Sequence, residues 1–193
     1  MSERLRINPA DPRPLLLIDV DGVLNALSAT LRRRVSRGHR APWQMHTLAG
    51  FQVMLNPEHG VAINDLASHF ELAWATSWEH EANELIGPQI GLPRLPVITF
   101  GLSDVSEEHP DAEMASRGSF NGWTTWKVPW VQAACKGRAL AWIDDDIGSD
   151  ARRWAKKRNA EEAPTKLIVP DPIHGVQPKH FAEALAWAER LTG

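Results

Sequence analysis

The chain has 193 residues, 43% of them hydrophobic, and a formal net charge of -3 at pH 7. This length predicts one domain over residues 1–193. The weak negative charge excludes nucleic-acid binding through the overall electrostatic field of the protein, so any contact with nucleic acid requires a local basic patch. The single cysteine, Cys135, excludes an internal disulfide, and no Cys/His cluster has zinc-finger spacing.

The N-terminal segment, residues 1–14, is charged and rich in proline and lacks the apolar centre of a signal peptide. No apolar run in the chain approaches the length needed to cross a membrane. We therefore expect a cytoplasmic protein without a membrane partner.

Five apolar runs that alternate with helix-like stretches predict an α/β fold. The runs are continuously apolar, as in parallel strands covered by helices on both faces. The expected fold is a three-layer Rossmann-like sandwich with a mainly parallel five-stranded sheet. The predicted strands are 14–19, 70–76, 96–100, 139–144 and 166–170, and the predicted helices are 79–87, 125–137, 149–159 and 178–191.

Residues 26–60 separate the first two predicted strands by more than a simple crossover needs. Residues 43–55 predict a small β-hairpin flap inside this insert, which we do not treat as a separate domain. An arginine-rich stretch precedes the flap and would either contact a polyphosphate or nucleic-acid end, or form a solvated helix face or a partner-binding surface. Its arginines are Arg32, Arg33, Arg34, Arg37 and Arg40.

Carboxylates follow two of the predicted strands at the point where each strand ends. Asp19 ends the first run and Asp21 comes two residues later; Asp144 ends the run 139–144 and Asp145 follows it. Parallel strands bring their carboxyl ends to one edge of the sheet, where ligands bind. Two carboxylates 4 Å apart repel by about 4 kcal/mol at an effective dielectric of 20, which a cation would relieve. Hard oxygen ligands in this number favour Mg²⁺.

Four segments in order resemble the motifs of the haloacid dehalogenase superfamily of phosphohydrolases. "DVDGVLN" (19–25) resembles the first motif, "LAWATSW" (72–78) the second and "AWIDDD" (141–146) the fourth, and Lys127 is assigned to the third by its position. "WATSWEHEAN" further resembles a capless subgroup associated with RNA-repair proteins. Val23 stands where the family often has a threonine.

The resemblance implies a role for each of these residues. Asp19 would attack phosphorus and form an aspartyl-phosphate, and Asp21 would act as general acid and then base. Thr76 and Lys127 would hold the phosphoryl oxygens. The remaining implied contacts are Gly22, Ser77 and Trp78 with the substrate, and Asp19, Asp144, Asp145 and the backbone carbonyl of Asp21 with Mg²⁺.

Several assignments stay open at this point. Asp19 and Asp21 would cap a turn if they had no catalytic role. Ser77 would replace Thr76 as the hydroxyl, and Lys136 would replace Lys127. Asp146 is an alternative metal ligand or a charge at a helix N-terminus.

Two other features have a structural and a functional interpretation. Trp126 and Trp130 are one helical turn apart, which favours a packed face over a platform for stacking bases. His174, with Asp171, would reach the catalytic edge or belong to a turn beside Pro172, and the turn is favoured.

The function predicted is a Mg²⁺-dependent phosphatase that hydrolyses a phosphomonoester. The insert is too short for a large cap, so the open site suggests a bulky substrate such as a nucleic-acid end or a phosphoprotein. The alternatives are a catalytically weak binding module of the same fold for phosphorylated or nucleic-acid partners, and a glycosyltransferase that uses its DxD motif to bind a divalent ion.

Overall fold

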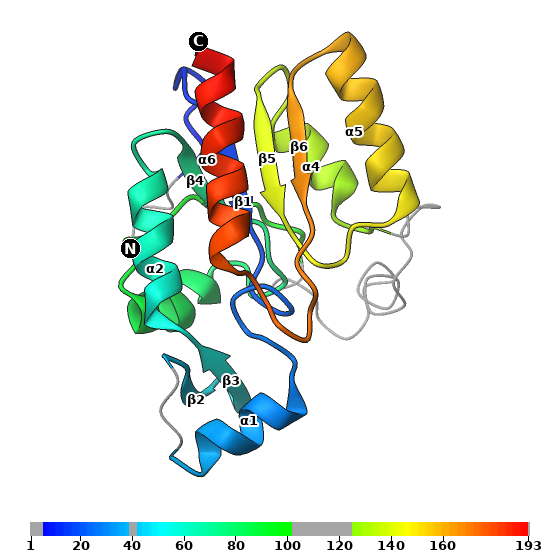
Figure 1. Cartoon of the computed structure of the whole chain (residues 1–193). Coiled ribbons are helices and arrows are strands. Elements are labelled where there is room, and N and C mark those ends of the chain that lie inside the picture. The colour runs from blue at the N-terminus through cyan, green and yellow to red at the C-terminus, as the bar shows by residue number, and fades with distance from the viewer. Residues whose placement is uncertain (1–5, 39–41, 102–124, 193) are drawn as a thin grey trace.

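The computed structural model of the chain describes residues 6–38, 42–101 and 125–192, and it has a mixed α/β fold (Figure 1). Its main sheet is parallel, with the strand order β4-β1-β5-β6. Ile18 of the central strand β1 pairs with Trp74 of β4 on one side and with Ile143 of β5 on the other. The strands are β1 (Leu15–Ile18), β4 (Glu71–Trp74), β5 (Leu140–Ile143) and β6 (Thr165–Ile168).

In the described part of the chain this sheet has four strands, and the five-stranded sheet expected from the sequence is not confirmed. The fifth strand was expected at residues 96–100. In this segment only Val97 pairs with the sheet, through an isolated parallel bridge to Trp74. Trp74 donates its N–H to the carbonyl of Pro96 and accepts from the N–H of Ile98, each at 2.9 Å. Because Pro96 has no N–H and cannot donate to a ladder, this apolar segment lies beside β4 without extending the sheet.

Side chains of β1 alternate between two apolar clusters, one on each face of the sheet. Leu16 and Ile18 lie in the first cluster, and Leu15 and Leu17 lie in the second. Helices on both faces therefore cover the sheet, as the continuously apolar runs predicted. The first cluster includes residues of α2 (Pro57–Leu66) and α6 (Pro178–Thr192), and the second includes residues of α4 (Val128–Ala134) and α5 (Ser149–Glu161).

The insert between β1 and β4 contains a helix and a small antiparallel hairpin. The helix α1 (Ala29–Ser36) begins after Ser28, whose hydroxyl accepts the N–H of Leu31 at 3.2 Å, and α1 has no buried residue. The hairpin consists of β2 (Gln44–Leu48) and β3 (Phe51–Leu55). Figure 1 shows α1 and the hairpin at the end of the molecule toward which the strands of the main sheet run.

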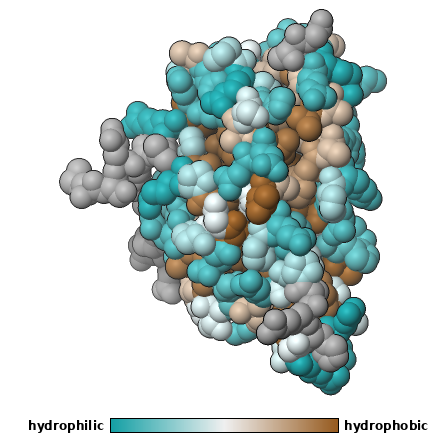
Figure 2. Space-filling view, turned by 60° about the vertical axis from the view of Figure 1, so that its left-hand side comes forward, coloured by the Kyte–Doolittle hydropathy of each residue, from teal (hydrophilic) through white to brown (hydrophobic). Residues whose placement is uncertain are grey.

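The predicted helix 79–87 is replaced by two short irregular turns, a π-helical turn η1 (Ala82–Ile86) and a 3₁₀ turn η2 (Gly87–Ile90). Among the described residues, no helix combines the length and the hydropathy that a membrane crossing requires. Figure 2 shows a largely hydrophilic surface interrupted by small groups of apolar residues on the side that faces left in Figure 1.

Candidate functional site

The candidate site lies where the order of the parallel strands reverses. The chain passes from β1 to β4 on one side of it and then to β5 on the other side. Asp19 directly follows β1 and Asp144 directly follows β5, and the N–H of Asp19 donates to the carbonyl of Ile143 at 3.1 Å. In open α/β sheets this position, at the carboxyl ends of diverging strands, is where ligands bind.

Three carboxylates meet at this edge. Oxygens of Asp19, Asp144 and Asp145 all lie within 4.8 Å of one another, and no second group of this kind occurs among the residues that the structure describes. Asp19 and Asp144 are buried, and Asp145 is partly buried. The Oδ1 atom of Asp19 is buried without a hydrogen-bond partner. A buried carboxylate oxygen without a partner is costly, so the site has one strong acceptor directed at a group that the protein does not supply.

Lys127, at the start of α4, is the one cation that contacts the cluster in the described structure. Its Nζ atom lies 2.9 Å from Oδ2 of Asp19 and 2.7 Å from Oδ2 of Asp144. Burial lowers the pKa of Lys127, but the attraction of Asp144 and Asp19 outweighs burial and holds this pKa above its usual value. Lys127 therefore stays charged beside Asp19 and Asp144, and its assignment to the third motif stays a prediction.

One ammonium does not neutralise three carboxylates. Burial raises the pKa of Asp19 to about 7, with Lys127 acting to lower it and Asp144 to raise it. Burial and the neighbouring Asp144 raise the pKa of Asp145 to about 6. The one positive charge of Lys127 does not balance the three carboxylates, and a bound divalent cation would compensate the remaining negative charge.

The residues present fit Mg²⁺. The available donors are carboxylate oxygens, which magnesium prefers, and no histidine or cysteine takes part in the cluster. The oxygen of Asp19 that lacks a partner offers one coordination position within the fold. Asp19, Asp144 and Asp145, three of the predicted ligands, are thus brought together.

Gly22 allows the third carboxylate to approach. It has φ +73, a left-handed conformation that residues with a Cβ rarely adopt, and a Cβ built on it would lie 2.3 Å from Cγ of Asp145. Any other residue would therefore strain the backbone and displace Asp145. The predicted role of Gly22 beside the phosphoryl group is not tested by this contact and stays a prediction.

The carboxylate of Asp21 is not among the clustered oxygens, because its two oxygens have other partners. Asn25 donates its Nδ2–H to Oδ1 of Asp21 at 2.6 Å, and Trp78 donates its indole N–H to Oδ2 at 2.9 Å. Asp21 is held in one orientation beside the cluster. The expected metal contact through its backbone carbonyl stays a prediction.

Asn25 connects Asp21 to the insert. Its Oδ1 atom accepts from the N–H of Met54 in β3 at 3.0 Å and from the guanidinium of Arg32 in α1 at 2.9 Å. Arg32 also donates to the carbonyl of Gln52 at 2.7 Å. Asn25 stands in the segment 19–25, but sequence reasoning assigned it no role, because its partners Arg32 and Met54 lie on segments that approach it only in the folded chain.

Thr76 and Ser77, the two hydroxyl candidates, lie in different environments. Thr76 is fully buried, and its Oγ1 accepts the N–H of Trp78 at a long 3.4 Å. Ser77 is exposed and, with Trp78, lines a recess beside Asp21. The choice between the two hydroxyls stays open, whereas Trp78 does lie at the site.

Thr125 and Asp150 support the turn that carries Lys127, and sequence reasoning missed both. Buried Asp150 accepts from the N–H of Thr125 at 3.1 Å and from its hydroxyl at 3.2 Å. The Thr125 hydroxyl oxygen accepts the N–H of Gly148 at 2.7 Å. These bonds tie the start of α4 to the start of α5. Asp146, which is exposed, donates its N–H to Oδ1 of Asp144 at 2.9 Å and takes no part in the cluster.

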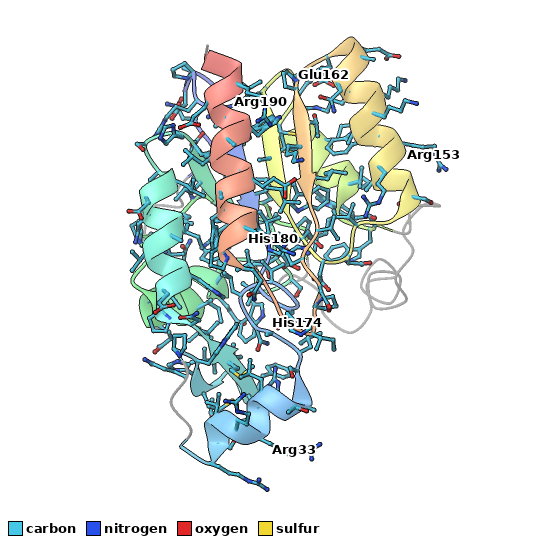
Figure 3. The ribbon with its side chains drawn as sticks, viewed as in Figure 1. Arg33, Arg153, Glu162, His174, His180 and Arg190 are labelled. Carbon is cyan, nitrogen blue, oxygen red and sulfur yellow. The ribbon has the colours of Figure 1, made fainter. Side chains whose placement is uncertain are left out.

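The arginines of the insert divide into two groups. Arg32 is committed to Asn25 and Gln52, so it acts within the fold. Arg33, Arg34 and Arg37 are exposed, and Figure 3 shows Arg33 extending away from the body of the molecule. Arg40 lies outside the described residues. Contact of this face with nucleic acid stays a prediction.

The remaining candidates have structural partners. Phe100 packs edge-to-face on Trp126 and Trp130, with ring centroids 4.9 and 5.9 Å apart, which favours the packed face. His174 and Asp171 form an exposed contact of 3.0 Å inside a turn, as favoured from the sequence. A larger hollow of about 990 Å³ lies along α5, but none of the clustered carboxylates lines it.

Comparison of the chain with protein-family models, with curated proteins and with solved structures gave no match.

Proposed function

We propose that this protein is a Mg²⁺-dependent phosphatase that resembles the capless haloacid dehalogenases and hydrolyses a phosphomonoester. The observation that carries the proposal is the buried Oδ1 atom of Asp19, which has no partner and belongs to a cluster with Asp144, Asp145 and Lys127. The helices on both faces of the parallel sheet support a Rossmann-like sandwich as the scaffold.

Asp19 is the nucleophile of the proposed reaction. A carboxylate oxygen of Asp19 forms a bond to phosphorus while the bond to the leaving oxygen breaks, and water then releases phosphate from the aspartyl-phosphate. The ion pair of Lys127 with Asp19 and Asp144 fixes an ammonium where negative charge collects. Positioning and electrostatic stabilisation supply most of the catalysis in phosphoryl transfer.

Asp21 is the proposed acid and base. It gives a proton to the leaving oxygen in the first step and takes one from the attacking water in the second. The bonds from Asn25 and Trp78 hold its carboxylate in place at the border of the recess. A carboxylate held in one orientation two residues after the nucleophile supports this role.

Asp19, Asp144 and Asp145 would hold Mg²⁺, with the backbone carbonyl of Asp21 as a further ligand. When bound, this ion supplies positive charge that offsets the charge of the transferred phosphoryl group.

One observation favours a phosphate-binding module with little turnover as a second candidate. The hydroxyl of Thr76 is fully buried, whereas the proposed reaction needs a hydroxyl at the phosphoryl oxygens. Exposed Ser77 would supply it in the catalytic case.

Hydrolysis of a generic aryl phosphate, with Mg²⁺ and with excess chelator, tests the proposal. We expect turnover that depends on Mg²⁺ and is lost in Asp19→Asn, together with trapping of the wild type by fluoroberyllate, detected by ¹⁹F NMR, and no trapping of the variant. Asp65→Asn, an exposed residue of α2, is the matched control. Undiminished turnover in Asp19→Asn would falsify the mechanism, and Mg²⁺-dependent phosphate binding without turnover would favour the binding module.

A further inference from the structure

A recess of about 330 Å³ opens beside Asp21, between β3 of the hairpin and the turn that follows β4. Its lining includes Asp21, Asn25, Phe51, Ser77, Trp78 and Glu81. This volume falls at the lower end of the range of small-molecule sites, so the recess suits a group of the size of one ring system. Asp21 lines the recess and stands two residues after Asp19 of the carboxylate cluster. A substrate with its phosphate at the cluster would therefore extend its neighbouring part toward this recess.

Two aromatic rings form the apolar part of the recess. Phe51 and Trp78 meet edge-to-face, with centroids 6.1 Å apart and an interplanar angle of 77°. Phe51, at the first position of β3, is 66% exposed. The edge-to-face contact leaves much of this ring in water, and a bound planar group would cover it.

Trp78 is held in place before any ligand binds. Its indole N–H donates to Asp21 at 2.9 Å, so rotation of the ring would break a bond to a carboxylate. The hairpin that carries Phe51 is fixed by the bonds of Asn25 to Met54 and of Arg32 to Gln52. Both walls of the recess are therefore preorganised, which reduces the entropy lost on binding.

The polar atoms of the recess distinguish between kinds of ring. Ser77 has a hydroxyl that donates and accepts, and exposed Glu81 has a carboxylate that accepts only. The edge of a nucleobase offers amino or imino N–H groups to such acceptors, whereas a phosphotyrosine ring has none.

We propose that this recess binds the base of a nucleotide whose phosphate lies at the carboxylate cluster. The base stacks on the face of Phe51 and meets Trp78 edge-to-face, and Glu81 accepts a hydrogen bond from its edge. This inference rests on the proposed phosphatase function and names its substrate class, a nucleoside monophosphate, free or at the end of a strand.

The experiment compares adenosine 5′-monophosphate with glycerol phosphate, which has a phosphate and no ring. Binding of both to Asp19→Asn with Mg²⁺ is measured by calorimetry, and kcat/KM for both is measured in the otherwise wild-type protein. The preference is the ratio of the two affinities, or of the two kcat/KM values, for adenosine 5′-monophosphate and glycerol phosphate. In Phe51→Ala we expect this ratio to fall at least about fivefold, because removal of one stacking ring costs at least about 1 kcal/mol. Phe51→Leu keeps apolar bulk without a ring face and should lose nearly as much, whereas Phe51→Trp should keep the preference. Val61→Ala, an equally exposed apolar residue on α2, is the matched control.

The outcomes separate this inference from the proposed function. If no phosphate ester is hydrolysed but nucleotide affinity still depends on Phe51, the phosphatase is wrong and the base site stands. If hydrolysis occurs and the Phe51 variants change both ligands equally or neither, the base site is wrong and the phosphatase stands. A phosphotyrosyl peptide and a 5′-phosphorylated oligonucleotide are measured in the same way. If Phe51→Ala weakens only the peptide, the nucleotide assignment is wrong. If Phe51→Ala weakens adenosine 5′-monophosphate but not the oligonucleotide, the site is restricted to free nucleotides.

Discussion

The carboxylate cluster and the recess each take a residue from the segment that follows β1, Asp19 and Asp21, yet other parts of the chain build the rest of them. The cluster comes from the ends of β1 and β5, where Asp19 and Asp144 are buried at the strand ends. The recess depends on a hairpin whose first strand residue, Phe51, is largely exposed, and on α1, which has no buried residue. The sheet therefore holds the buried charges, and the attached hairpin lines an open recess.

From this difference we expect the proposed metal site and the proposed base site to be separable by mutation. Changes at the cluster should alter metal binding, turnover and stability together, because buried charges contribute to all three. Changes at the recess should alter turnover or ligand choice with little effect on stability. The following variants test that separation, beginning with the largest expected effect.

Lys127→Met should give the largest effect on both properties. The change leaves Asp19 and Asp144 buried without their cation, which costs about 3–5 kcal/mol in the free energy of unfolding. Turnover should fall at least about 100-fold, as when one electrostatic stabiliser is removed. Urea unfolding without Mg²⁺ and aryl phosphate hydrolysis measure the two effects. Lys136→Met is the matched control, because Lys136 is exposed near the start of β5, and an equal loss in this control would contradict the assignment of Lys127.

Gly22→Ala should come next. The added Cβ meets the carboxylate of Asp145 at 2.3 Å in a left-handed backbone, and the two effects together cost about 2–4 kcal/mol. Gly38→Ala has the same φ of +73 with nothing within 4 Å of the added Cβ, so it isolates the cost of the backbone alone. Calorimetric titration with Mg²⁺ should show weaker binding in Gly22→Ala only. Equal Mg²⁺ affinity in both variants would remove Asp145 from the metal site.

Trp78→Phe should reduce kcat about tenfold while changing stability little. The variant keeps a ring in the recess but loses the hydrogen bond to Asp21, and about 1.4 kcal/mol corresponds to tenfold in rate. Steady-state kinetics with the aryl phosphate measure this loss. Trp43→Phe is the control, because Trp43 packs on His59 away from the recess. If only KM changes, the indole N–H of Trp78 positions the ligand and does not position Asp21.

Asp145→Asn should give the smallest effect and a characteristic dependence on pH. The pKa of Asp145 is raised to about 6, so the folded protein binds a proton more tightly than the unfolded chain, and the metal-free wild type loses stability as the pH rises through 6. Between pH 5 and pH 8 this loss is about 1 kcal/mol or less, since the group is partly solvated.

The measurement is the free energy of unfolding in urea without Mg²⁺ at both pH values. Asp145→Asn should lose less stability than the wild type between them, and Asp65→Asn should behave as the wild type does. If Asp145→Asn is less stable than the wild type at pH 8, the ionised carboxylate of Asp145 stabilises the metal-free protein, which contradicts this prediction.

The amino-acid sequence determined the features that depend on short segments. Continuous apolar runs predicted parallel strands over 14–19 and 139–144, where the structure has β1 and β5. The carboxylates at the ends of these runs were expected at one edge of the sheet, where Asp19 and Asp144 do meet. The antiparallel hairpin of the insert also agrees with the flap expected over 43–55. Local pattern failed at residues 96–100, where apolar character suggested a strand but Pro96 withholds a ladder hydrogen bond.

Only the tertiary structure decided which side chains meet across the site. Trp78 reaches Asp21 over 57 positions of the chain, and Met54 reaches Asn25 over 29. Asn25, Phe51 and Asp150 gain their partners from segments whose order in space depends on the whole packed core, so no nearby residue signals their roles. Hydrophobic periodicity places a carboxylate at the end of a strand, but the partners of that carboxylate depend on how strands, helices and the insert pack together, since burial is a property of the whole fold.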